Sequence, residues 1–89
     1  MTLREFKALS LAKLMMLSKK LKEKYPEKSD RIEYLVDVLV AKLQSLRKYT
    51  LTDYLFTVYL SLREFPEFAE LMPSKEEVEE LLKENGGSE

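Results

Sequence analysis

The sequence predicts an all-α fold, a small helical bundle of three main helices plus a short C-terminal helix. Apolar residues recur at three- and four-residue spacing through every long segment, as in amphipathic helices. Prolines occur only at positions 26, 66 and 73, and glycine is absent before position 86, so the chain divides into helix-length pieces. We expect one helical domain over residues 1–85 and a flexible tail over residues 86–89.

The first helix is expected to open with Thr2-Leu3-Arg4-Glu5 and to run to about Lys24. Thr2 and Glu5 have the spacing of a capping box, in which each side chain bonds the backbone N–H of the other residue. Pro26 disfavours helical geometry at the residue before it and therefore ends the helix. Apolar side chains occur on all sides of this segment, which indicates burial on several sides, in the bundle or against another chain.

A second helix is expected from Asp30 to about Lys48, with Glu33 as the capping-box partner of Asp30. It carries the clearest apolar stripe of the chain. The stripe comprises Ile32, Leu35, Val36, Leu39, Val40, Leu43 and Leu46. A minor apolar strip lies behind it, formed by Tyr34, Val38 and Ala41.

The third helix is expected to begin near Thr50 or Thr52 and to end before Pro66. Its β-branched and aromatic residues would also suit a strand, but the three- and four-residue repeat favours a helix and no other segment offers a strand partner.

A short helical turn is expected over residues 67–71, followed by a last helix. Ser74 and Glu77 predict a capping box at the start of this helix, and Asn85-Gly86-Gly87 is expected to end it.

The core is expected to centre on aliphatic residues of the three main helices. They are Leu14, Leu17, Leu21, Leu35, Leu39, Leu43, Leu46, Leu55, Val58 and Leu62. Six of the nine aromatic residues fall between Tyr49 and Phe68, and of these we expect Tyr54 and Phe65 to lie in the core.

The composition excludes most enzyme chemistry. The chain has no cysteine, histidine or tryptophan, and its two glycines lie at the C-terminal end, so thiol, imidazole and phosphate-loop mechanisms are ruled out. Glu76 and Glu80 lie one turn apart and could meet Mg²⁺, but acids near a helix N-terminus are usually solvated. We expect a protein without enzymatic activity, catalytic residues, metal or cofactor.

The composition also indicates the source and location. Glutamate (13) and lysine (11) dominate the charged residues, and Gln44 and Asn85 are the only side-chain amides. This pattern is typical of proteins from hyperthermophiles. The most apolar run, residues 8–17, is interrupted by polar residues and is too short to span a bilayer, so we expect a cytoplasmic protein without a membrane partner.

Charge is distributed unevenly along the chain. Residues 1–50 hold 12 basic and 6 acidic side chains, whereas residues 51–89 hold 3 basic and 10 acidic ones. The asymmetry fits either nucleic-acid contact by the basic half or attraction between the two halves within the bundle. The candidate nucleic-acid contacts are Lys19, Lys20, Lys22, Lys24, Lys28 and Arg31.

The apolar surface exceeds what one small bundle can cover. Phe56 and Leu60 lie off the main apolar face of their helix, and Leu9 and Met16 lie opposite the main face of theirs. We therefore predict that these four residues contribute to an apolar patch that docks on a larger protein or on a second copy of the chain. The competing explanation is that the C-terminal helix folds back over them with Val78, Leu81 and Leu82.

In size and Lys/Glu-rich composition the chain resembles small helical accessory subunits of archaeal replication and RNA-processing assemblies. No motif carries this resemblance, so no residue role follows from it. The leading expectation is an interaction subunit of a larger assembly, and the alternative is a small nucleic-acid-associated protein that uses the basic half.

Overall fold

The computed structural model describes residues 1–83, which form α-helices and 3-10 helices joined by short turns, with no strand among them. The predicted all-α fold is therefore confirmed. The elements in chain order are α1 (Leu3–Lys24), η1 (Pro26–Lys28), α2 (Ser29–Gln44), η2 (Lys48–Thr50), α3 (Leu51–Glu64), η3 (Pro66–Leu71) and α4 (Lys75–Lys83). The expected helix end at Asn85 and the expected tail lie outside the described residues.

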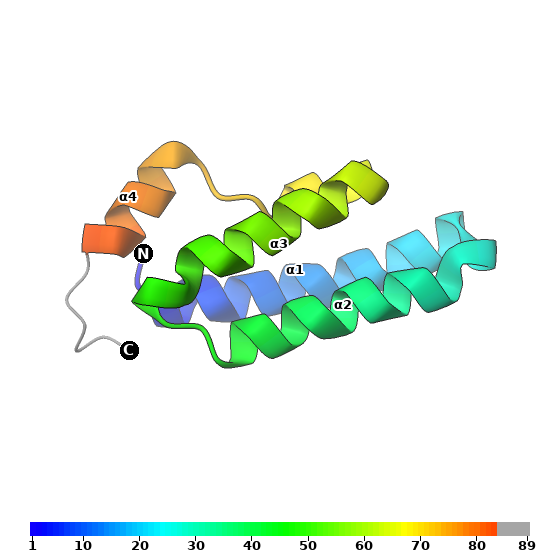
Figure 1. Ribbon diagram of the computed structural model, residues 1–89, viewed down its shortest axis with the longest axis horizontal. Coiled ribbons are helices and arrows are strands. Elements are labelled where there is room, and N and C mark those ends of the chain that lie inside the picture. Colours follow the sequence, from blue (N-terminus) through cyan, green and yellow to red (C-terminus); the bar gives the residue numbers. More distant parts are fainter. Residues whose placement is uncertain (84–89) are drawn as a thin grey trace.

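The long helices form an antiparallel bundle (Figure 1). Helices α1 and α2 pack side by side as a hairpin, and α3 runs back along α2. The short η3 segment packs between α3 and α1, so it closes the side of the bundle away from α2. Helix α4 lies beside the N-terminus, and no described helix is long and apolar enough to cross a membrane.

The predicted bounds of α1 are confirmed, and so is its capping box. Thr2 Oγ1 accepts a hydrogen bond from the Glu5 N–H at 3.0 Å, and Glu5 Oε1 accepts one from the Thr2 N–H at 2.7 Å. The helix ends at Lys24, two residues before Pro26. The cap and the proline together set the length of the longest element in the bundle.

Both ends of α2 differ from the prediction. The helix begins at Ser29, so Asp30 lies inside its first turn and Lys28 takes the N-cap position, where no side chain caps the helix. The Glu33 carboxylate pairs with Lys22 of α1. It ends at Gln44, four residues earlier than expected. The following turn still buries Leu46, and the Arg47 N–H donates to Thr50 Oγ1 at 2.8 Å, which starts η2.

The later elements begin and end close to the positions that the sequence predicts. Helix α3 ends before Pro66, and η3 covers the expected helical turn. The capping box of α4 is confirmed, since the Ser74 N–H donates to Glu77 Oε1 at 2.8 Å and the Glu77 N–H donates to Ser74 Oγ at 3.1 Å.

The core is larger than predicted. Eight of the ten predicted residues are buried, whereas Leu55 and Leu62 are only partly buried and pack at its margin. Tyr54 and Phe65 lie inside as expected. The core also takes in Leu3, Phe6, Ile32, Val36, Leu51, Phe68, Leu71 and Leu81.

Aromatic rings connect the elements across this core. The rings of Phe6 in α1 and Tyr54 in α3 meet edge to face, with centroids 6.1 Å apart. Phe65, which follows α3, lies 5.4 Å from Tyr25, which follows α1, and 6.3 Å from Phe68 of η3, so the ends of α1 and α3 meet η3 at this ring. Such ring pairs add stability beyond the burial of area.

Candidate interaction surfaces

The outer face of α3 carries exposed apolar side chains. Phe56 and Leu60 follow the buried residues Tyr54 and Val58 by two positions, which turns each of them to the far side of the helix. Phe56 is 57% exposed and Leu60 is 47% exposed. Tyr59 is exposed beside them, and its ring stacks on that of Phe56 with centroids 6.5 Å apart.

Tyr34 extends this surface from α2. Two ion pairs show that these helices run antiparallel. Arg31 at the start of α2 pairs with Glu64 at the end of α3, and Lys42 near the end of α2 pairs with Asp53 near the start of α3. The Arg31 guanidinium also lies 5.3 Å from the centroid of the exposed Tyr34 ring. Since Leu60 lies one turn before Glu64, Tyr34 and Leu60 flank the same junction between the helices.

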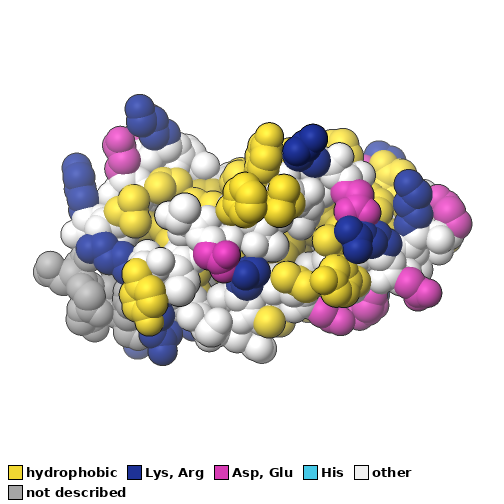
Figure 2. Space-filling model, viewed as in Figure 1, with side chains coloured by type: hydrophobic (Ala, Val, Ile, Leu, Met, Phe, Trp, Pro, Cys, Tyr) yellow, Lys and Arg dark blue, Asp and Glu magenta, His cyan; other side chains and the backbone are white. Residues whose placement is uncertain are grey.

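We call this surface the α2–α3 patch, formed by Tyr34, Phe56, Tyr59 and Leu60. Figure 2 shows hydrophobic side chains gathered over α3 and α2, with acidic and basic side chains between them. Sequence reasoning found Phe56 and Leu60 but not the two tyrosines. Tyr34 did appear in the minor strip of α2, but only the antiparallel pairing with α3 brings that strip to the patch.

A second apolar surface lies on α1. Leu9 is 50% exposed and Met16 is 74% exposed. Ala8, Ala12 and Met15 are exposed as well. We call these five residues the α1 face.

The two surfaces do not form one patch. The buried sides of α1 and α3 belong to the same core, with Leu14 and Leu17 from one helix and Tyr54 and Val58 from the other. The exposed sides of the two helices therefore point outward in different directions. The structure brings Phe56 and Leu60 together, and Leu9 and Met16 together, but it does not join the two pairs.

Helix α4 does not cover these residues. Its Leu81 is buried, but the helix packs near the start of α1, where the Met1 ammonium group lies 2.5 Å from the Glu80 carboxylate. Phe56, Leu60 and Met16 remain exposed with α4 in place. The competing explanation, in which the C-terminal helix folds back and covers these exposed apolar residues, is therefore wrong for the part of the chain described.

The basic cluster at the first interhelical turn is largely paired with acids. Lys20 lies 3.5 Å from Glu70, and Lys24 lies 2.7 Å from Glu67. Lys22 pairs with Glu33 of α2.

Two further members of this cluster also have contacts. Arg31 donates to both oxygens of Glu64, and Lys28 lies 5.8 Å from the centroid of the Phe65 ring. Lys19 is exposed and has no ion-pair partner within residues 1–83. Within residues 1–83, five ion pairs join the basic half of the chain to its acidic half: Met1 ammonium–Glu80, Lys20–Glu70, Lys24–Glu67, Arg31–Glu64 and Lys42–Asp53.

These contacts shift the ionisation of the acids involved. The pKa of Glu64 is lowered mainly by its hydrogen bonds from Arg31. The pKa of Glu67 is lowered mainly by the hydrogen bond from Lys24. Both acids are held in the charged form, so the charge of the basic half is partly neutralised within the fold.

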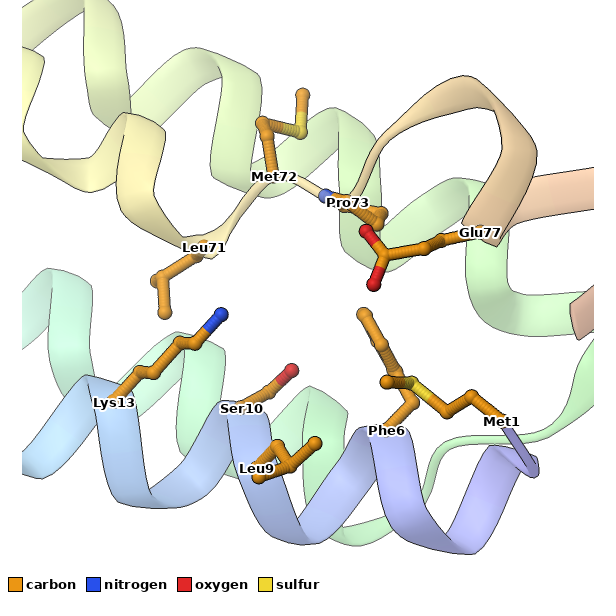
Figure 3. Close-up of a pocket in the computed structure, with 9 residues that line it drawn as sticks. All are labelled: Met1, Phe6, Leu9, Ser10, Lys13, Leu71, Met72, Pro73 and Glu77. Atoms are coloured by element: carbon orange, nitrogen blue, oxygen red, sulfur yellow. The ribbon is translucent and has the colours of Figure 1, made fainter.

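A small pocket lies between α1 and the segment that joins η3 to α4 (Figure 3). Ser10, Lys13 and Glu77 contribute its polar groups, and Leu71 and Met72 contribute to its apolar wall. Its volume of about 40 Å³ is far below the 300–1,000 Å³ typical of small-molecule sites. It has room for a few water molecules rather than a substrate.

Two acids of α4, Glu77 and Glu80, have hydrogen-bond or ion-pair partners. Glu77 belongs to the capping box, and the hydrogen bond from the Ser74 backbone is the main cause of its lowered pKa. Glu80 pairs with the Met1 ammonium group. Within residues 1–83, no group of three potential metal ligands lies together.

Comparison with known proteins gave no relative: no family model, curated protein or solved structure matches this chain. Its function is therefore argued from its own surfaces.

Proposed function

We propose that this chain is a non-enzymatic interaction subunit that docks on a larger protein of an intracellular assembly through the α2–α3 patch. The observation that carries the proposal is the exposure of four large apolar side chains along α3 and the α2–α3 junction, outside a bundle with a filled core. They are Tyr34, Phe56, Tyr59 and Leu60. Contiguous apolar surface of this kind typically marks a protein contact.

The composition of the patch supports a protein partner. Aromatic residues are enriched at the centres of protein interfaces, and tyrosine combines a large apolar body with a hydrogen-bonding group. The ion pairs Arg31–Glu64 and Lys42–Asp53 lie along the α2–α3 junction and provide a polar rim. The absence of cysteine and histidine supports a role without catalysis.

The test compares the wild-type chain with the double variant Phe56→Ser/Leu60→Gln. Each form is used as bait for affinity purification from the native host, and the bound proteins are identified by mass spectrometry. We expect a protein that the wild type retains and the variant loses, because polar groups at the centre of an interface leave the facing apolar surface unpaired.

The matched control is Leu82→Gln, which changes an exposed leucine on α4, outside the patch. This control should retain the partner. If the double variant and the control retain the same proteins, the proposal fails.

The alternative is a small nucleic-acid-associated protein, such as an accessory factor of a replication or RNA-processing complex. The observation in its favour is the basic excess of residues 1–50, including Lys19, which has no ion-pair partner among residues 1–83. Phosphate contacts weaken steeply as salt rises, so this alternative requires salt-sensitive binding of DNA or RNA at low ionic strength. If titration detects none, the alternative fails.

The composition supports a source that grows at high temperature, because thermolabile amides are nearly absent and Lys and Glu dominate the charge. We expect a melting temperature well above the roughly 45–65 °C of mesophile domains. A value inside that range would contradict the thermophile proposal.

A further inference from the structure

The exposed side of α1 has the pattern of a helix-pairing seam. Glu5, Leu9, Ala12, Met16 and Lys19 recur at alternating spacings of four and three residues. This repeat places side chains along one line of a helix that can pack against another helix. The line spans about 21 Å at 1.5 Å per residue. Its centre is apolar, its N-terminal end is acidic and its C-terminal end is basic.

The positions of Glu5 and Lys19 at opposite ends of the seam favour a second copy of α1 that runs antiparallel to the first. When the seam meets a second copy of itself running antiparallel about Ala12, Glu5 lies opposite Lys19 of the second copy, and Lys19 lies opposite Glu5. Thr2 lowers the pKa of Glu5 through the backbone hydrogen bond of the capping box, so Glu5 is charged at neutral pH. A parallel pair would instead place Glu5 against Glu5 and Lys19 against Lys19, and like charges at close range repel.

The same register gives complementary packing at the centre. Leu9 lies opposite Met15 of the second copy, and Met16 lies opposite Ala8. A hollow lined by Met1, Glu5, Ala8 and Leu9 among the described residues opens at this position. A flexible methionine side chain suits such a hollow, and the two Ala12 residues let the helix backbones approach closely.

We propose that the α1 face binds a second copy of this chain, as an antiparallel α1–α1 pair with a two-fold axis at Ala12. The interface is self-complementary, as a two-fold dimer requires. It deepens the proposed function by naming the occupant of one surface, and it leaves the α2–α3 patch available to the larger partner.

The first test uses sedimentation equilibrium of the wild type and of Ala12→Glu between about 1 µM and about 1 mM, a range that covers a small interface. The wild type should show a monomer–dimer equilibrium. In Ala12→Glu two carboxylates meet at the axis, so the dimer Kd should rise at least about tenfold. The matched control Ala41→Glu changes an exposed alanine on α2 and should leave the Kd unchanged.

The second test determines the direction of the pair by disulfide formation, since the chain has no native cysteine. In the proposed dimer the two Ala12→Cys residues face each other and should form a disulfide under oxidation. The two Ala8→Cys residues lie about 12 Å apart along the helix axis, beyond the roughly 7 Å Cα separation that a disulfide allows. They should therefore stay reduced.

Three outcomes would overturn the inference. The wild type could remain monomeric at all concentrations, the dimer could persist in Ala12→Glu, or Ala8→Cys could cross-link as readily as Ala12→Cys, which would indicate a parallel pair. None of these results affects capture of a larger protein by the α2–α3 patch. Conversely, loss of capture in Phe56→Ser/Leu60→Gln would leave the α1 dimer intact.

Discussion

Arg31 of α2 donates two hydrogen bonds to the Glu64 carboxylate of α3, at 2.7 and 3.0 Å, and its guanidinium lies 5.3 Å from the centroid of the Tyr34 ring. One side chain thus joins the two helices and holds an aromatic residue of the α2–α3 patch. The geometry depends on the planar guanidinium, which can bond both carboxylate oxygens and lie against a ring at the same time.

Arg31→Lys should disturb the patch more than the fold. Lysine keeps the positive charge but cannot make the two-point contact, and exposed ion pairs contribute little to stability. We expect a small drop in melting temperature together with altered ring-proton NMR shifts of Tyr34. Lys42→Arg at the other end of the junction is the control and should leave those shifts unchanged. Unaltered Tyr34 shifts in Arg31→Lys would show that Arg31 does not position the ring.

Acid should destabilise the fold through the carboxylates that bond to basic side chains. The pKa values of Glu64 and Glu67 are lowered in the folded chain from the ordinary value of 4.5 by hydrogen bonds from Arg31 and Lys24. A lowered folded-state pKa stabilises the fold above the unfolded-state pKa, and this contribution is lost as pH falls through the folded value.

The free energy of unfolding should therefore be steady at neutral pH and decline below about pH 4.5. Urea titrations at a series of pH values measure this. The double variant Glu64→Gln/Glu67→Gln should show a shallower decline, and an identical decline would contradict the assignment.

High pH should destabilise the fold through ionisation of the Tyr54 hydroxyl group. Burial raises the pKa of this phenol from 10.0 to about 12, with a small opposing effect from nearby Ser10, although no hydrogen bond of normal geometry joins the two side chains. A raised folded-state pKa means that the contribution is fully present below pH 10 and is lost as pH rises through about 12.

Tyr54→Phe removes this titration and should unfold less readily than the wild type between pH 10 and 12. At neutral pH it should be nearly as stable as the wild type, because the hydroxyl group it removes is buried without a hydrogen-bond partner. Thermal unfolding monitored by circular dichroism at pH 8 and pH 11 separates the two effects. Equal losses of melting temperature at pH 11 in both proteins would argue against Tyr54.

Core and patch leucines should respond differently to truncation. Leu39 is fully buried, so Leu39→Ala should lower the free energy of unfolding by about 2–5 kcal/mol. Leu60 is half exposed, so Leu60→Ala should cost much less, within about 1 kcal/mol. Chemical denaturation measures both values. A comparable cost at Leu60 would assign it to the core.

Local signals account for what the sequence predicted well. The capping boxes at Thr2 and Ser74 and the prolines at positions 26 and 66 act within a few residues of themselves, so they can be read directly from the chain. The early end of α2 could not be read in this way. No glycine or proline marks it, and Leu46 is buried although it lies in the turn after the helix, so the apolar stripe continues past the helix end.

The other features that the sequence did not predict depend on tertiary contacts. Phe68 and Leu71 are buried because η3 packs between α1 and α3, an arrangement that no local pattern specifies. Tyr34 belongs to the α2–α3 patch because α2 and α3 pair antiparallel, and the sequence did not give the relative placement of these helices. The apolar surplus itself was visible in the sequence, but its division into two separate surfaces was not.

Docking through the α2–α3 patch is tested most directly by the dissociation constant for the larger host protein that this chain captures. Isothermal titration calorimetry measures it, alongside the free energy of unfolding. For Phe56→Ser/Leu60→Gln, we predict a Kd at least about tenfold higher than that of the wild type and an unfolding free energy within about 1 kcal/mol of it. An unchanged Kd would show that the patch is not the docking surface. A cooperative loss of stability in the isolated chain would show that Phe56 and Leu60 support the fold instead.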